Sequence, residues 1–164
     1  MNLCPTTRPR RGDAMHAMTT YDRQTTPLRW QMQFSPVRKC VPLARTLVSK
    51  TLVSWGYGQE CIDRVVLVCG ELSANAVEHG GRRGHLFEVR LTVDGPHCLV
   101  EVSDAGRTPP RPIQAGEDDE GGRGLLLVAA LSEETGHHDR YPIGKTVWAR
   151  LVLSSPSEES ACTS

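Results

Sequence analysis

Two polar side chains four residues apart, Glu71 and Asn75, carry the clearest chemistry in this sequence. They lie in the segment 71–80, ELSANAVEHG, near the end of a stretch with helical periodicity. Residues i and i+4 share one face of a helix. Glu can accept a proton, and the Asn carbonyl oxygen is a hard ligand suited to Mg²⁺. The pair is suited to phosphoryl transfer, although the same spacing is common on ordinary solvated helix faces.

A second candidate feature is the short motif formed by Asp104 and Gly106, which directly follows an alternating apolar segment. A carboxylate there could accept a hydrogen bond from an exocyclic amine such as that of adenine. Gly106 would let a base approach the backbone closely. The alternative is a simple Asp-x-Gly turn, which needs no ligand.

A third feature is a glycine cluster, Gly121, Gly122 and Gly124, which leads into an apolar helical segment beginning near Leu125. Glycines before a helix expose backbone N–H groups at the positive end of the helix dipole, where anions bind. Arg123 within the cluster could contact a phosphate or extend into solvent. The cluster is not a P-loop, because no Gly-Lys-Ser/Thr follows it. A plain turn into a helix is the competing interpretation.

The elements that must position these residues alternate between strand and helix patterns. Apolar residues at a period of two predict strands, and repeats at three and four predict helices. The predicted strands are 28–34, 86–93, 99–102, 133–141 and 145–153, and the predicted helices are 37–54, 59–79 and 125–131. Between them, 107–120 is a long loop, Pro-rich and then acidic, of the kind that forms lids or binding loops. This order predicts an α+β two-layer sandwich, with a mixed, mostly antiparallel sheet and helices on one face.

Composition narrows the function further. The 164 residues contain 19 basic and 19 acidic side chains, so no net basic field attracts nucleic acid or an anionic membrane. No apolar run reaches the roughly 20 residues of a membrane span, and we expect a cytoplasmic location. The six cysteines lack metal-site spacing and are expected to be mostly buried thiols. We expect a disordered arm over 1–27, one domain over 28–154 and a flexible tail over 155–164.

Three sequence segments in this order resemble the motifs of the GHKL ATPase superfamily, which has the Bergerat ATP-binding fold. ELSANAVEHG resembles the N-box of that family, SDAGR its first glycine box, and GGRGLLLV its second. The preceding VPLARTLVSKTLVSWG is similar to the opening helix of the family. The resemblance extends over about 28–153, and it is greatest to bacterial anti-sigma-factor serine/threonine kinases and their small stand-alone actinobacterial relatives.

The resemblance implies a role for each candidate residue, with ATP and Mg²⁺ as cofactors. Asn75 would bind the Mg²⁺ that bridges the phosphates, and Glu71 would act as general base. Asp104 would bind the adenine amine with Gly106 beside it, and 107–120 would be the ATP lid. The phosphates would be held by the backbone that opens the third helix, namely by Gly122, Arg123, Gly124 and Leu125.

The resemblance also implies protein partners. A kinase of this type would bind a sigma factor, phosphorylate Ser or Thr on an anti-sigma antagonist, and form a homodimer, with the 28–34 strand as a candidate interface. The alternative is a non-catalytic switch, in which ATP controls partner binding without phosphoryl transfer. The catalytic domain of a two-component histidine kinase is disfavoured, because the sequence contains no helical hairpin bearing a phospho-acceptor His.

Overall fold

One five-stranded sheet and three helices make up the part of the chain that the structure describes. This computed structural model describes residues 26–80, 84–106 and 123–154. The expected arm, lid and tail, together with Gly121 and Gly122, lie almost wholly outside these ranges. The elements in chain order are β1 (Leu28–Phe34), α1 (Cys40–Ser54), α2 (Gln59–His79), β2 (Phe87–Asp94), β3 (His97–Asp104), α3 (Arg123–Leu131), β4 (Glu134–Asp139) and β5 (Lys145–Val152).

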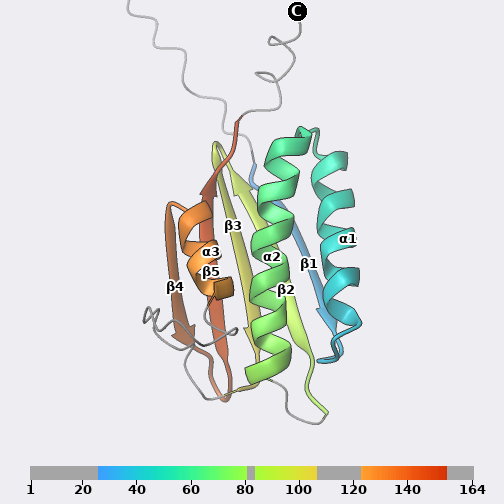
Figure 1. The fold of residues 1–164 in the computed structure, drawn as a ribbon, viewed down its shortest axis with the longest axis vertical. Coiled ribbons are helices and arrows are strands. Elements are labelled where there is room, and N and C mark those ends of the chain that lie inside the picture. The colour runs from blue at the N-terminus through green and yellow to red at the C-terminus, as the bar shows by residue number, and fades with distance from the viewer. Residues whose placement is uncertain (1–25, 81–83, 107–122, 155–164) are drawn as a thin grey trace, which may run out of the picture.

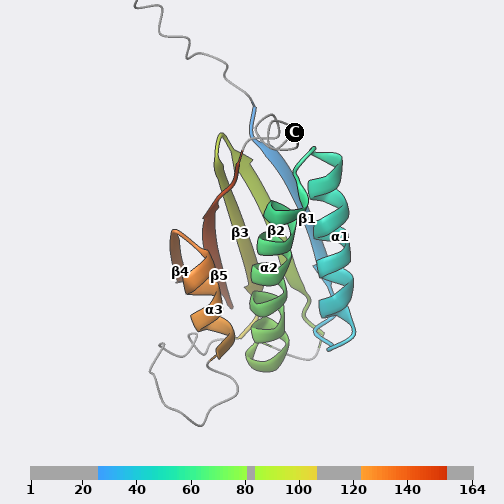
Figure 2. The same cartoon turned by 45° about the horizontal axis from the view of Figure 1, so that its top comes forward.

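The strands form a sheet in the order β1-β2-β3-β5-β4, and every described pair is antiparallel. All three helices lie on the same face of this sheet, with α2 between α1 and α3 (Figures 1 and 2). The predicted α+β two-layer sandwich is confirmed. Chain segments far apart in sequence meet in the centre, because β5 inserts between β3 and β4.

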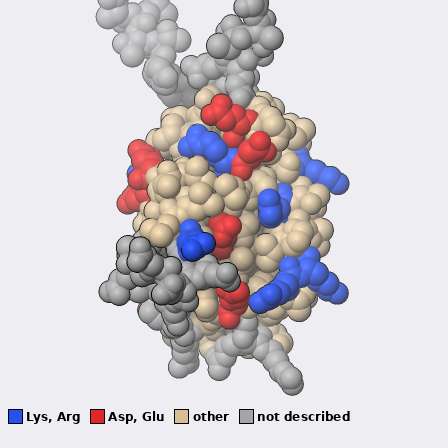
Figure 3. Space-filling view, viewed as in Figure 1, with Lys and Arg blue, Asp and Glu red and all other residues tan. Residues whose placement is uncertain are grey.

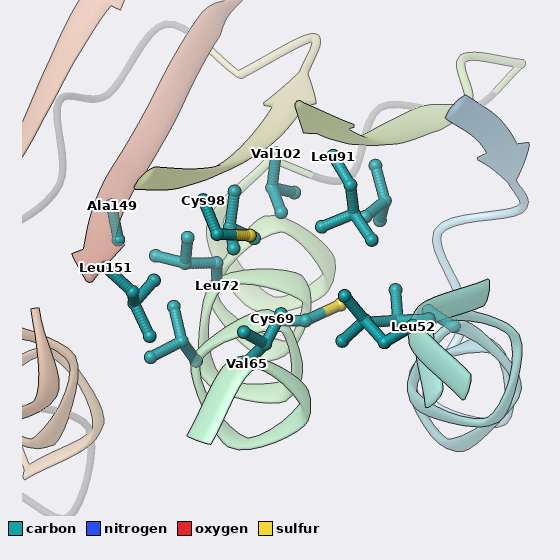
Figure 4. Packing of buried hydrophobic residues seen from close by; sticks show 14 of the residues in the cluster. Leu52, Val65, Cys69, Leu72, Leu91, Cys98, Val102, Ala149 and Leu151 are labelled. Atoms are coloured by element: carbon teal, nitrogen blue, oxygen red, sulfur yellow. The ribbon is translucent and has the colours of Figure 1, made fainter. Parts of the chain in front are cut away.

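The hydrophobic core lies between the sheet and the helices. The strands contribute to it because their side chains alternate between the helix-covered face and the opposite face. In β2 and β3 every second side chain is buried, as expected for strands with one covered face. Helix α2 contributes the largest helical share, from residues repeating at three and four. Side chains from both layers interlock, as Figure 4 shows for Leu52, Val65, Cys69, Leu72, Leu91, Cys98, Val102, Ala149 and Leu151.

Helix α1 begins later than the sequence suggests. The sequence predicts a start at Val37, because Ser35 is a favourable N-cap and Pro36 is typical of a first helical turn, but the helix begins at Cys40. The proline in its first turn is Pro42. Its lack of an N–H costs no helical hydrogen bond there, because the N–H groups of the first turn have no acceptor within the helix. Two prolines six residues apart offered the same start signal, and the sequence alone could not choose between them.

The buried cysteines behave as apolar core residues. Cys61, Cys69 and Cys98 are buried free thiols, which confirms the prediction for these three, while Cys40 is partly exposed. Burial raises the pKa of Cys69 to about 11 and that of Cys98 to about 12. Both thiols therefore stay protonated and unreactive at neutral pH.

Surface charge agrees with the balanced composition on the face that carries the helices. Acidic and basic side chains are interspersed there among uncharged ones (Figure 3). Among the helices of the described residues, none combines the length and apolar character required to cross a membrane.

A matched pair of substitutions in α1 tests the core. Leu52→Ala, at a fully buried position, should lower the free energy of unfolding by about 2–5 kcal/mol, because it removes apolar contacts and leaves a cavity. Leu43→Ala, where the side chain is 49% exposed on the same helix, should change it by less than about 1 kcal/mol. Urea denaturation measures both, and equal losses would contradict the assigned packing of α1.

Candidate functional site

The candidate residues are spaced along α2 in two groups. Glu71 lies in the middle of this helix, Asn75 one turn later, and Gly80 directly after its last residue, His79. At about 1.5 Å of rise per residue, Glu71 and Gly80 are separated by about 13 Å along the helix axis. Glu71 and Asn75 are partly buried. The candidate site along α2 is therefore elongated, with two distinct ends.

At one end, Asp104 is the last residue of β3 and is almost fully buried, at 3% exposure. Its Oδ1 accepts two hydrogen bonds, from the Gly106 N–H at 2.7 Å and from Lys145 Nζ at 3.1 Å. Lys145 is itself buried, at 1% exposure, and is the first residue of β5. The antiparallel register of β3 and β5 places Asp104 and Lys145 opposite each other on the helix-covered face.

The end of α2 contacts this carboxylate through Gly80. A Cβ added at Gly80 would overlap Asp104 Cγ, and one added at Gly106 would lie 2.8 Å from both Gly80 Cα and the His79 carbonyl oxygen. Both glycines therefore have a packing role, because only a residue without a Cβ lets these backbones approach. That Gly106 also admits a base remains a prediction.

Two polar atoms of the candidate residues are buried without a hydrogen-bond partner among the described groups. They are Asp104 Oδ2 and Asn75 Nδ2. Such atoms are uncommon, because each loses its hydrogen bonds to water without replacement. The Asn75 amide can also present its carbonyl oxygen in the same place by a half-turn of the side chain. One free acceptor on Asp104 and one free amide on Asn75 fit a ligand with an amine at one end and a bound cation nearer the other.

At the other end, Glu71 lies against the start of α3. A Cβ added at Gly124, the second residue of α3, would overlap Glu71 Oε2. The positive end of the α3 dipole is thus next to a carboxylate, and the same end would favour phosphate. Arg123 is exposed, whereas Leu125 packs against the core, so Leu125 could offer a ligand only its backbone.

The structure brings the predicted residues together in pairs. Asp104 contacts Gly106, and Glu71 meets Gly124, while Asn75 lies between these pairs along α2. Gly122 lies outside the described residues, so its predicted role is unexamined.

Comparison with known proteins agrees with this arrangement. The family model described as a histidine kinase-like ATPase domain matches residues 35–151, which is more than half of the chain. The chain belongs to this family. None of the curated proteins compared with it matches its sequence.

A solved structure shares the fold of this ATPase domain. It contains the RsbU and RsbW domains of Rv1364c from Mycobacterium tuberculosis, with a TM-score of 0.58 and 22% sequence identity. The similarity covers 79% of this chain and 33% of that one, so this chain spans about a third of the length of the chain it matches.

Sequence reasoning missed one residue of the candidate site, Lys145. The sequence did contain a sign of its burial. Lys145 alternates in β5 with the same period of two as the buried residues Val147, Ala149 and Leu151, so its side chain lies on the same face of the strand as theirs. A lysine in the inward phase of a strand requires a buried partner. The partner, Asp104, is 41 residues away in sequence and becomes evident only from the strand pairing.

The contact between α3 and Glu71 can be tested by a double-mutant cycle. Gly124→Ala should destabilise the protein by about 1–3 kcal/mol, because the new methyl group displaces the Glu71 carboxylate or the start of α3. In a Glu71→Ala background that cost should largely disappear. Equal costs in the two backgrounds, measured by urea denaturation, would show that Glu71 does not lie against Gly124.

Proposed function

We propose that this histidine kinase-like ATPase domain binds ATP with Mg²⁺ and acts as an anti-sigma-type protein serine/threonine kinase. The main support for the proposal is the placement of Glu71 and Asp104. The general-base candidate Glu71 faces the N-terminus of α3 at one end of the candidate site, and Asp104 offers a free acceptor oxygen at the other. An ATP molecule has matching features, with phosphates at one end and an amine-bearing base at the other.

The hydrogen bonds at Asp104 support adenine binding at this end of the candidate site. Both donors at Asp104 go to Oδ1, so Oδ2 is available to accept from an exocyclic amine. The tight packing of Gly80 and Gly106 around this carboxylate fixes its position before any ligand arrives.

The middle of the candidate site, at Asn75, supports a magnesium ligand. Asn75 would supply one carbonyl oxygen, and phosphate oxygens and water would complete the shell, because Mg²⁺ usually takes few protein ligands. Bound Mg²⁺ would neutralise charge that develops on the transferring phosphoryl group. Among the described residues, no group of three or more His, Cys, Asp or Glu side chains could hold a metal by itself.

At the phosphate end, Glu71 would take the proton from the attacking Ser or Thr hydroxyl. The hydroxyl oxygen bonds to the terminal phosphorus as the bond from that phosphorus to the oxygen of ADP breaks, and the proton remains on the carboxylate until solvent removes it. The backbone at Arg123, Gly124 and Leu125 would stabilise the negative charge with the positive end of α3.

The protein partners in this proposal are a sigma factor and an anti-sigma antagonist in the cytoplasm. The N-box and glycine-box motifs suggest them, and the solved structure that shares this fold contains an RsbW domain. A homodimer through β1 is part of the same proposal. It is supported by the position of β1 at the sheet edge and by Leu28 and Met32, each 40% exposed.

Phosphoryl transfer from γ-labelled ATP to a panel of recombinant anti-sigma antagonist domains tests the kinase function. Glu71→Gln should lower transfer by about 100-fold or more, since it removes the proton acceptor while keeping the shape of the side chain. ATP affinity, measured by calorimetry, should change by less than about fivefold. Glu78→Gln is the matched control, because Glu78 lies on the same helix with its side chain 50% exposed, and it should leave transfer unchanged.

Two outcomes would contradict different parts of this proposal. Transfer that survives in Glu71→Gln would exclude Glu71 as the base. Intact ATP binding by the unmodified protein, without transfer to any antagonist domain, would favour the non-catalytic switch instead. That function needs Asp104 and Asn75 but not a proton acceptor at Glu71.

A further inference from the structure

Lys145 has no part in the function proposed so far, yet it is the most deeply buried charged residue of the described chain, at 1% exposure. Its Nζ donates to Asp104 Oδ1 at 3.1 Å, and the two side chains are each 2% exposed. Burying two opposite charges contributes little net stability to a fold, because the cost of desolvating both groups offsets much of their attraction. The pair therefore calls for an explanation beyond stability.

The hydrogen bonds at Asp104 are distributed unequally between its two oxygens. A carboxylate oxygen has two lone pairs, and those of Oδ1 are both engaged, one by Lys145 Nζ and one by the Gly106 N–H. Oδ2 is buried and has no partner among the described groups. To an incoming ligand, Asp104 is therefore a single-oxygen acceptor rather than a two-oxygen one.

This difference matters for the choice of nucleobase. Adenine presents one exocyclic amine, flanked by a ring nitrogen that is an acceptor. Guanine presents two adjacent donors, N1–H and the 2-amine, which match both oxygens of a carboxylate, and it has a carbonyl oxygen at the position of the adenine amine. A carboxylate with only Oδ2 free can accept from the adenine amine but cannot pair with both guanine donors.

We infer that Lys145 is a positioning residue that makes the site selective for a base edge with one donor, as in adenine, over an edge with two adjacent donors, as in guanine. It does so by occupying Asp104 Oδ1 and leaving only Oδ2 to the ligand. The inference rests on the proposed ATP binding, and it adds the origin of base selectivity. Lys145 acts through Asp104 and does not itself contact the base.

The surroundings of Lys145 hold it in this place. It begins β5 and pairs in register with Asp104, directly after Gly144, whose φ of 104° suits glycine. A Cβ at Gly144 would overlap the Asp104 carbonyl oxygen, so the hairpin between β4 and β5 packs directly against the end of β3. The ammonium group therefore meets the carboxylate from a fixed direction.

Competitive binding of ATP and GTP to the full chain, against a fluorescent ATP analogue, tests the inference. The unmodified protein should prefer ATP over GTP by at least about tenfold, the equivalent of one hydrogen bond to a charged group. Lys145→Met frees one of the two lone pairs of Oδ1, the other still accepting from the Gly106 N–H, and should reduce that preference to about threefold or less. Lys50→Met, at an exposed position of α1, is the matched control and should leave the preference unchanged.

A neutral double variant covers the case in which Lys145→Met fails to fold because it leaves a buried carboxylate unpaired. Asp104→Asn with Lys145→Met removes both charges, which buried pairs tolerate better than the loss of one partner. Its Asn amide would accept from the Gly106 N–H and direct its NH₂ group at the base. That donor suits the guanine carbonyl, so the preference should reverse toward GTP.

The outcomes separate this inference from the proposed function. No binding of either nucleotide by the unmodified protein would refute ATP binding, and the inference with it. Equal binding of ATP and GTP, or an ATP preference that persists in both Lys145 variants, would refute the role of Lys145 while leaving ATP binding intact. A preference lost in Lys145→Met and reversed in the double variant would establish it.

Discussion

Helix α2 is held against the centre of the sheet by the burial of its apolar stripe, which includes Val65, Cys69 and Leu72. This packing fixes both the rotation of the helix and its position along the strands. Its rotation leaves Glu71 facing α3, and its position brings Gly80 against Asp104 at the end of β3. Each end of the candidate site is therefore set by hydrophobic burial in the middle of the molecule rather than by polar contacts. A change that shifted α2 by one turn would separate both pairs at once.

Much of this arrangement could be predicted from sequence, because α2 and the strands follow strong periodic patterns. The bounds of α2 and β1 were predicted correctly, and the helix face bearing Glu71 and Asn75 followed from their spacing. Helix α1 was placed three residues too early, because Pro36 and Pro42 give the same local signal. Local patterns could not reveal Lys145, whose partner is set by the register of two strands distant in sequence. Nor could they show that Gly80 and Gly106 are required by backbone packing, since that contact joins a helix end to a strand end.

The buried polar groups also indicate where this ATPase domain departs from an optimally stable core. Asp104 and Lys145 together place two charges in the interior, and Asp104 Oδ2 and Asn75 Nδ2 have no partner among the described groups. Each of these features lowers stability relative to an apolar core of the same shape. The two unpartnered atoms belong to Asp104 and Asn75, which the sequence motifs single out, and Lys145 contacts Asp104. Unsatisfied groups gathered in this way are expected where a ligand completes the hydrogen bonding.

The central claim is that α2 carries a nucleotide site running from Asp104 to Glu71. A crystal structure of the full chain with Mg²⁺ and a non-hydrolysable ATP analogue tests it most directly. We expect the adenine amine within hydrogen-bond distance of Asp104 Oδ2, the Asn75 carbonyl oxygen bound to Mg²⁺, and the terminal phosphate between Glu71 and the start of α3. A nucleotide bound elsewhere, or bound with Asp104 Oδ2 still unpartnered, would contradict it.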